Sequence, residues 1–399
     1  MTRSRHSQPF AHFDQRFVLG FDRQDEPSHW VSNRSSRINI GGIPLPENAL
    51  DPTPQASHLF DDLYLPATSI DILTMEADEQ NDHDSTFGGS RASLASSSTS
   101  LESAITNYQY EHGRRYHGYQ AGKYHFPNDE QELNRMDIEH HNQRLQMNGA
   151  LHMCPLEDPE EILELGTGSG IWAMDMADLY PRAQIIGTDL SPVQPSWVPP
   201  NCKFEVDDFE LDWTYGSNRF DMIFERFLIG SISDHTRLYK EAFAALKPGG
   251  WLEAVEMEAH TFSDDDTLPK DSALVKWGHL IHEAFAKMGR PFPKVEEYKR
   301  YMEDAGFVNV EFQIMKRPNN DWPRDPRWKE IGKFCCLNYL EGLEGFTIAP
   351  FTRVLGWKKE EVDVFLAQVR KEMVSRKIHG WMKGFVLTAQ KPLYPAAAA

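Results

Sequence analysis

Short apolar runs alternate with stretches of helical period along residues 156–260. These runs are bounded by glycine, proline or acidic residues, and they predict buried strands at 161–165, 183–189, 202–206, 220–224 and 251–256. Apolar residues recur at helical spacing over 171–180 and 234–246. Alternating strands and helices with short connections predict an α/β fold whose sheet is mostly parallel, with helices on both faces.

The flanking regions follow other patterns. Upstream, a helix is predicted from about residue 128 to residue 151, with Asn128 or Asp129 as its N-cap. Downstream, helical periods and strand alternation predict helices at 271–288, 294–305, 322–340 and 358–376 and strands at 307–314 and 381–389. We therefore expect an N-terminal cap segment (106–155), a Rossmann-like core (156–260) and a C-terminal part with substrate-side helices and the last strands (261–395).

Residues 1–105 differ in composition from the rest of the chain. They contain seven arginines, no lysine and 15 acidic residues, and they are rich in Ser, Pro, Asp and Gln. Such a segment buries too little apolar surface to offset the entropy of ordering it. We predict a disordered acidic, serine-rich tail.

Charge and cysteine usage exclude several classes of function. The chain has 41 basic and 60 acidic residues, so it lacks the basic footprint that binding nucleic acid needs. The four cysteines show no metal-ligand spacing, so we expect no metal site. An apolar signal region and a membrane-length apolar run are both missing, so we expect no membrane association and an intracellular protein of the cytoplasm or nucleus.

The segment Glu164-Leu-Gly-Thr-Gly-Ser-Gly170 joins the first predicted strand of the core to its first helix. Glycines in such a turn let the backbone approach a nucleotide closely, because a Cβ atom would hold the ligand away. A P-loop is excluded because no Gly-Lys-Ser/Thr follows. Two interpretations remain: an NAD fingerprint over 168–173, and the E/DxGxGxG loop that holds S-adenosylmethionine.

The sequence downstream favours S-adenosylmethionine. Asp189 ends the second strand, where an acid can bind ribose hydroxyls, and Asp207-Asp208 follows the third, which suits an adenine amino group. With the later 220–224 strand and the Lys-Pro-Gly-Gly turn at 247–250, this order resembles a class I methyltransferase.

The resemblance narrows to the LaeA-like methyltransferases of filamentous fungi. It is carried by Tyr116-His-Gly-Tyr-Gln-Ala-Gly-Lys-Tyr-His-Phe-Pro-Asn-Asp129, by Gln194-Pro-Ser-Trp-Val-Pro-Pro-Asn201 and by Lys247-Pro-Gly-Gly-Trp-Leu-Glu253. The likeness covers about residues 108–392. It implies a role in secondary metabolism, either as an enzyme encoded with biosynthetic genes or as a regulator that binds velvet-type or chromatin proteins.

For the cofactor, the resemblance implies S-adenosylmethionine bound by residues at the strand ends, namely Glu164, Gly166, Thr167, Gly168, Gly170, Asp189, Leu190, Asp207, Asp208 and Glu225. The predicted cap helix has two interpretations. It is either a packing helix or a lid over the cofactor, to which Tyr124, Asp129 or Arg135 would contribute.

Methyl transfer depends first on aligning the nucleophile with the methyl group and excluding water. A general base is needed only when the nucleophile carries a proton that must leave. Candidates near the ends of strands four and five are Glu225, Arg226 and His260, with Glu256 and Glu258 beside them.

The sequence gives less information about the methyl acceptor. An aromatic set could line a flat pocket or simply form core: Trp277, Phe285, Trp322, Trp328, Phe334, Tyr339, Phe346 and Trp357. Our leading hypothesis is an S-adenosylmethionine-dependent enzyme that methylates a small secondary metabolite or intermediate, and the aromatic set makes an aromatic acceptor one candidate. The alternatives are a LaeA-like regulator and, more distantly, an NAD-dependent oxidoreductase.

Overall fold

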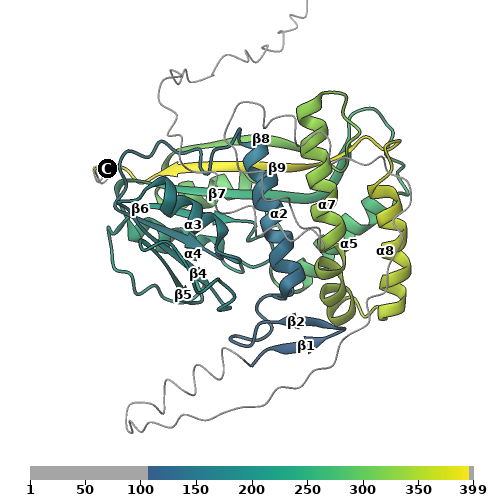
Figure 1. Cartoon of the computed structure of the whole chain (residues 1–399), viewed down its shortest axis with the longest axis horizontal. Helices are drawn as coiled ribbons and strands as arrows, with labels where there is room; N and C mark the ends of the chain where they lie inside the picture. Colours follow the sequence, from purple (N-terminus) through teal and green to yellow (C-terminus); the bar gives the residue numbers. More distant parts are fainter. Residues whose placement is uncertain (1–106, 395–399) are drawn as a thin grey trace, which may run out of the picture. The chain divides into compact units, whose positions relative to one another are not determined.

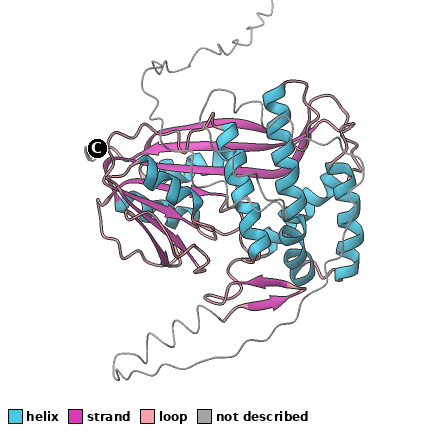
Figure 2. Cartoon of the chain, in the orientation of Figure 1, coloured by secondary structure: helices cyan, strands magenta, loops and turns pink. Residues whose placement is uncertain are grey.

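A computed structural model describes residues 107–394; the prediction for the tail at 1–105 lies outside this range. Within the described residues, seven strands form one sheet in the order β5-β4-β3-β6-β7-β9-β8 (Figures 1 and 2). β9 runs antiparallel to both of its neighbours, β7 and β8, and all the other neighbouring pairs are parallel. The predicted α/β architecture with a mostly parallel sheet is confirmed.

The strands of the sheet are β3 (Glu161–Leu165), β4 (Gln184–Asp189), β5 (Cys202–Val206), β6 (Phe220–Arg226), β7 (Leu246–Ser263), β8 (Val308–Pro318) and β9 (Gly380–Gln390). The helices are α2 (Glu130–Gln146), α3 (Ile171–Leu179), α4 (His235–Ala245), α5 (Ala273–Lys287), α6 (Val295–Ala305), α7 (Pro326–Ala349) and α8 (Lys359–Met373), with a π-helical turn η3 (Pro350–Val354) after α7. A small hairpin, β1 (Gln109–Glu111) and β2 (Arg114–Tyr116), precedes α2.

Alternate residues of the central strands supply cores on both faces of the sheet. Leu163 of β3 packs with α4 and α6, whereas its neighbour Ile162 packs with α3 on the opposite face. On the α3 face, Trp172 stacks on Phe224 with ring centroids 3.8 Å apart. This burial on both faces explains why the core strands read as continuous apolar runs.

The far half of β7 supports a third core. Residues 256–263 of this strand pair with β9, beyond the part of β7 that pairs with β6. α5, α7 and α8 pack into one cluster there with Ala259 of β7 and Met382 of β9. In Figure 1 these helices lie toward one end of the sheet, and α2 lies beside α7. The cap helix and the C-terminal helices are therefore neighbours.

Several predicted boundaries are corrected. β6 continues to Arg226 and β7 to Ser263, because each keeps a strand partner beyond the predicted end. The 247–250 segment interrupts the pairing of β7 instead of preceding the strand: Phe220 pairs with Leu246 and Met222 with Trp251. α2 ends at Gln146, before a left-handed turn at residues 148–149.

Two other predictions concern the cap and the membrane. Asp129 is the N-cap of α2, as one of the two predicted alternatives, and its side chain accepts a hydrogen bond from the backbone N of Glu132. Across residues 107–394 the helices are too short or too polar for any of them to span a bilayer.

Candidate active site

A cavity of about 1120 Å³, the solvent at its mouth included, lies at the carboxyl ends of β3, β4, β5 and β6. Its inner wall comes from the turns after these strands, and its outer wall comes from residues 123–139 of the cap segment. Ligands of doubly wound folds bind at this edge of the sheet. We call it the first cavity.

The glycine loop after β3 leaves room for a ligand. Gly166 and Gly168 have φ values of +64° and +56°, which side chains rarely adopt. A Cβ on Gly166 would collide with Leu228, and one on Gly168 would come within 2.7 Å of Met136 Sδ. The cavity wall therefore needs glycine at both positions.

Asp189 at the end of β4 holds the glycine loop. Its carboxylate accepts hydrogen bonds from the backbone N of Gly168 (2.9 Å) and of Ser191 (3.0 Å). Burial raises the pKa of Asp189 to about 6, although these donors favour its charged form. The acid that was predicted to bind the ribose therefore holds the glycine loop in place.

Glu164 and Arg226 place opposite charges at one end of the cavity. Glu164 is 2% exposed and accepts a hydrogen bond from the Thr167 hydroxyl. Burial raises the pKa of Glu164 to about 7, while the charge of Arg226 lowers it. Both residues line the cavity, so this end can bind a ligand that carries both signs of charge.

The cap segment is fastened to the opposite wall by polar contacts. Lys123 forms an ion pair with Asp208, and Asn128 Nδ2 donates to Ser191 Oγ over 3.0 Å. Ser169 Oγ donates to Asp137 Oδ1 over 2.7 Å. These contacts close the cap over the cavity.

The structure brings most of the predicted cofactor residues together. The predicted residues that line the cavity are Glu164, Gly166, Thr167, Gly168, Asp189, Leu190 and Asp208, together with Tyr124, Arg135 and Arg226. Lys123, Asn128, Glu139 and Ser191 also line it and were not predicted. Lys123 and Asn128 lie inside the 116–129 motif of the resemblance, which was the available signal.

Seven predicted residues do not line the first cavity, and Glu256 and Glu258 of β7 are two of them. Gly170 packs against Phe204, and Asp207 accepts a hydrogen bond from Tyr215. Glu225 is fully buried and accepts from the Tyr239 hydroxyl over 2.7 Å. Asp129 pairs with Arg114 at the start of α2, and His260 contacts His282 on the far half of β7. For Glu225 and His260 the reason is that both strands extend past their predicted ends.

A second cavity of about 680 Å³, again with the solvent at its mouth included, adjoins the first. Its lining residues include Tyr124, Phe126, Arg135, Glu139, Phe227, Ile229, Trp277, Asn338, Tyr339 and Phe346. The two cavities share Tyr124, Arg135, Glu139 and Phe227, so they meet beneath the cap. Of the predicted aromatic set, Trp277, Tyr339 and Phe346 line this cavity; Phe285 is core.

Glu139 is the carboxylate that both cavities share. It is 4% exposed and pairs with Arg317 of β8, whose Nη2 lies 2.6 and 2.7 Å from the two carboxylate oxygens. The Tyr339 hydroxyl is buried beside Arg317, and among residues 107–394 it has no acceptor for its proton. A charged pair and an unpaired hydroxyl therefore lie next to an otherwise largely apolar cavity.

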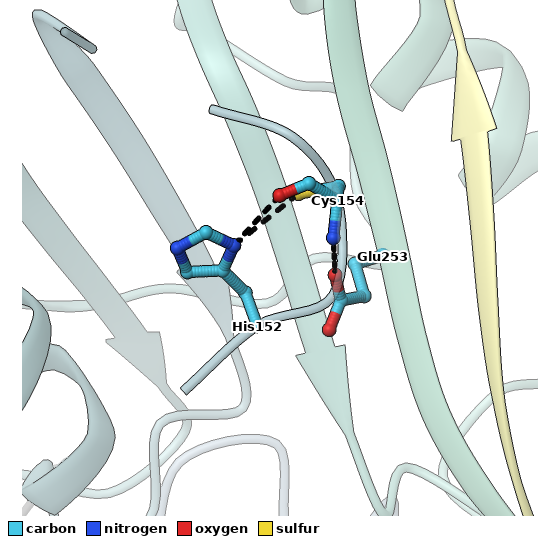
Figure 3. A group of neighbouring side chains, drawn as sticks. All are labelled: His152, Cys154 and Glu253. Atoms are coloured by element: carbon cyan, nitrogen blue, oxygen red, sulfur yellow. Dashed lines mark hydrogen bonds between the residues drawn. The ribbon is translucent and has the colours of Figure 1, made fainter. Parts of the chain in front are cut away.

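His152, Cys154 and Glu253 form a separate group on the α3 face of the sheet (Figure 3). Their possible metal-ligating atoms lie within 4.8 Å of one another. Glu253 Oε2 accepts from the backbone N of Met153 and of Cys154, each over 2.8 Å. His152 bonds through Nδ1 to the Cys154 carbonyl and through Nε2 to the Tyr180 hydroxyl, each over 2.9 Å. The bonds to Glu253 anchor residues 153–154 to β7, and both ring nitrogens of His152 are engaged within this group and by Tyr180.

The chain is similar to known methyltransferases. Residues 138–312 match a family described as a methyltransferase domain. A solved structure, the phosphoethanolamine N-methyltransferase 2 of Haemonchus contortus with S-adenosyl-L-methionine, aligns over 74% of this chain and 73% of its own with 16% identity and a TM-score of 0.42.

Fungal relatives share a higher sequence identity with this chain than that structure does. The methyltransferase pytC of Aspergillus terreus is 45% identical over 300 residues, covering 74% of this chain and 92% of pytC. The secondary metabolism regulator laeA of Aspergillus fumigatus is 34% identical over 304 residues, covering 75% and 81%. The protein-methionine methyltransferase laeA of Emericella nidulans is 34% identical over 297 residues, covering 74% and 79%. The chain therefore belongs to the family of S-adenosylmethionine-dependent methyltransferases that includes pytC and the LaeA regulators of secondary metabolism.

Proposed function

We propose that the protein methylates a small, largely apolar acceptor with at least one planar ring, and that this reaction belongs to secondary metabolism. The observation that carries the proposal is the junction of the two cavities at Tyr124, Arg135, Glu139 and Phe227. The cofactor would occupy the first cavity and the acceptor the second. When bound, S-adenosylmethionine supplies an electrophilic methyl group on a sulfonium.

The residues of the first cavity suit this cofactor. Asp189 offers carboxylate oxygens to the ribose hydroxyls, and Asp208 offers them to the adenine amino group. Glu164 offers a buried carboxylate to the ammonium. The glycine loop lets the backbone approach the ligand closely, because Gly166 and Gly168 carry no side chain and hold left-handed backbone angles.

The second cavity suits a flat apolar molecule. Phe126, Trp277 and Phe346 give it aromatic walls, and Ile229 and Ile281 add aliphatic ones. Such a cavity binds a ring by excluding water, while a few polar groups fix its orientation. Asn338 and Tyr339 are the polar groups we assign to that orientation.

The chain's residues perform the reaction mainly by positioning. The contacts of the cap with Asp208, Ser191 and Ser169 hold the two ligands together and exclude water from the junction. If the acceptor loses a proton, Glu139 is the carboxylate at the junction that can receive it. Sequence reasoning named other candidates because nothing in the spacing of α2 marks Glu139.

The names of the relatives support an alternative. Two of them are called a secondary metabolism regulator and a protein-methionine methyltransferase. In that case the methyl acceptor or binding partner would be a protein, such as a velvet-type regulator, and the protein would act in the nucleus as well as the cytoplasm.

One experiment separates these two functions. The purified full chain is incubated with methyl-labelled S-adenosylmethionine and a panel of planar phenols, indoles and aromatic acids. We expect label in an organic-soluble product with at least one ring compound, and much slower formation of that product by the Ile229→Trp variant, which fills the second cavity. Label found only in protein would contradict the small-molecule proposal and support the alternative.

A further inference from the structure

Three side chains from different elements form a hydrogen-bonded chain that ends in the first cavity. Arg226 Nη1 of β6 lies 3.1 Å from His140 Nδ1 of α2, and His140 Nε2 lies 3.0 Å from Asp175 Oδ2 of α3. His140 is 4% exposed, and Arg226 lines the cavity. The cap helix is therefore joined to the cavity wall through an imidazole.

The hydrogen-bond partners determine the state of His140. Burial lowers the pKa of His140 to about 4, so the ring is neutral near pH 7. A neutral ring that donates from Nε2 to Asp175 keeps an acceptor lone pair on Nδ1. Because guanidinium can only donate, Arg226 is the donor in the other contact. The hydrogen bonds that run from Asp175 through His140 thus fix the direction of the Arg226 guanidinium.

The remaining donors of Arg226 lie at the cavity wall beside Glu164. Guanidinium has five N–H groups, and His140 takes one of them. Within residues 107–394 the Arg226 side chain has no second hydrogen-bond acceptor, although Glu164 is close enough to affect its pKa. A fork of donors beside a buried carboxylate matches the carboxylate and ammonium of an α-amino acid.

We propose that Arg226, oriented by His140 and Asp175, binds the α-carboxylate of S-adenosylmethionine, while Glu164 binds its α-ammonium. This rests on the placement of the cofactor in the first cavity proposed above. His140 and Asp175 are positioning residues, because they act on the ligand through Arg226. The cap helix then contributes to cofactor recognition without touching the cofactor at His140.

The test uses three ligands that differ at the amino-acid end. S-adenosylhomocysteine has both charged groups, decarboxylated S-adenosylmethionine lacks the carboxylate, and methylthioadenosine lacks both. Calorimetry on the full chain measures each dissociation constant for wild type and for Arg226→Met. We expect Arg226→Met to weaken S-adenosylhomocysteine about 10- to 100-fold, the ratio that a charge-assisted hydrogen-bond pair gives, and to change the other two ligands less than about twofold.

Each result of this test is informative. Equal weakening of all three ligands, or of none, would overturn the inference and leave Arg226 as a brace for α2. Failure of wild type to bind any of the three would overturn the cofactor placement itself, so the two failures are distinguishable.

Substitutions of His140 test the positioning role. His140→Phe removes the acceptor, so we expect S-adenosylhomocysteine to bind about tenfold more weakly and methylthioadenosine to bind as before. His140→Gln retains an acceptor oxygen and should recover most of that loss. A purely structural role of His140 would weaken both ligands alike, and that result would refute the positioning role.

Discussion

The walls of the first cavity and those of the second are built in different ways. In the first, the inner wall consists of residues at the carboxyl ends of β3, β4 and β6 and in the turns that follow β3, β4, β5 and β6. In the second, the walls come from α2, α5, α7, β7 and the turn after β6, which are far apart in the sequence. The first wall carries charged side chains such as Glu164, Asp189 and Arg226, whereas the second consists mainly of apolar side chains.

This difference separates what is shared in such a fold from what can vary. The ends of adjacent parallel strands must meet at one edge of the sheet, so the first wall follows from the topology. Helix faces such as those of α5 and α7 can change residues without disturbing the sheet. A chain of this kind can therefore change its acceptor and keep its cofactor.

The cap helix α2 belongs to both cavities, and polar contacts hold it against the C-terminal helices and β8. Arg135 Nη1 donates to Asn338 Oδ1 over 2.7 Å, and Asn142 Nδ2 donates to Cys335 Sγ over 3.2 Å. The buried Glu139–Arg317 pair lies between them. Breaking this pair should therefore disturb the walls of the second cavity more than those of the first.

The largest expected effect is on stability. Arg317→Met leaves Glu139 buried without its partner, which costs about 3–5 kcal/mol of unfolding free energy. The double variant Glu139→Gln with Arg317→Met should recover much of that loss, since no unpaired charge remains. Urea unfolding measures both.

A matched control lies next in the chain. Lys316 pairs with Asp264, and both side chains are more than half exposed, at 51% and 60%. Lys316→Met should therefore change stability by no more than about 0.5 kcal/mol. A loss under about 1 kcal/mol for Arg317→Met would show that the pair does not hold the cap.

The second prediction concerns the first cavity. Gly168→Val places a side chain against Met136 at a left-handed backbone position and fills the ligand's space. We expect affinity for S-adenosylmethionine to fall more than about 100-fold, roughly 2.7 kcal/mol. Gly216→Val is the control, because Gly216 also has a positive φ but has open space around it and does not line the cavity. Similar affinities for the two variants would place the cofactor elsewhere.

The same comparison explains what could be predicted from the sequence. Glu164, Gly168 and Asp189 were identified because each lies at a fixed offset from an apolar run, and a strand's end is a local property. The choice of S-adenosylmethionine over NAD came from the order of acids after successive strands, and the family relationship confirms it.

The second wall could not be predicted in this way. Glu139 pairs with a residue 178 positions away, and no local pattern signals such a contact. Helical spacing of aromatic residues does not distinguish core positions from cavity walls: Phe285 packs in the core, whereas Trp277 lines the second cavity. Glu225 was misplaced for a different reason, since the strand continued past the point where its apolar run ended.

The third prediction tests the independence of the two cavities. Ile229→Trp fills the second cavity from the turn after β6. We expect kcat/KM for a ring acceptor to fall on the order of 30-fold, the equivalent of about 2 kcal/mol of overpacking. The affinity for S-adenosylmethionine should change less than about twofold. Ile229→Ala enlarges the same cavity and should leave cofactor binding unchanged too; parallel losses of both functions would show that the cavities are not independent.

The smallest effect is a pH dependence confined to the first cavity. The pKa of Glu164 is about 7, and its charged form is the one that binds an ammonium. Lowering the pH from 7 to 6 should weaken S-adenosylmethionine about fivefold, because the carboxylate becomes protonated while the ligand's amino group stays mostly charged in this window. Methylthioadenosine has no ammonium, so its affinity gives the reference that removes any contribution of Asp189. In the Glu164→Gln variant, the ratio of the two affinities should be independent of pH. If the ratio is also independent of pH in wild type, Glu164 does not bind the ammonium.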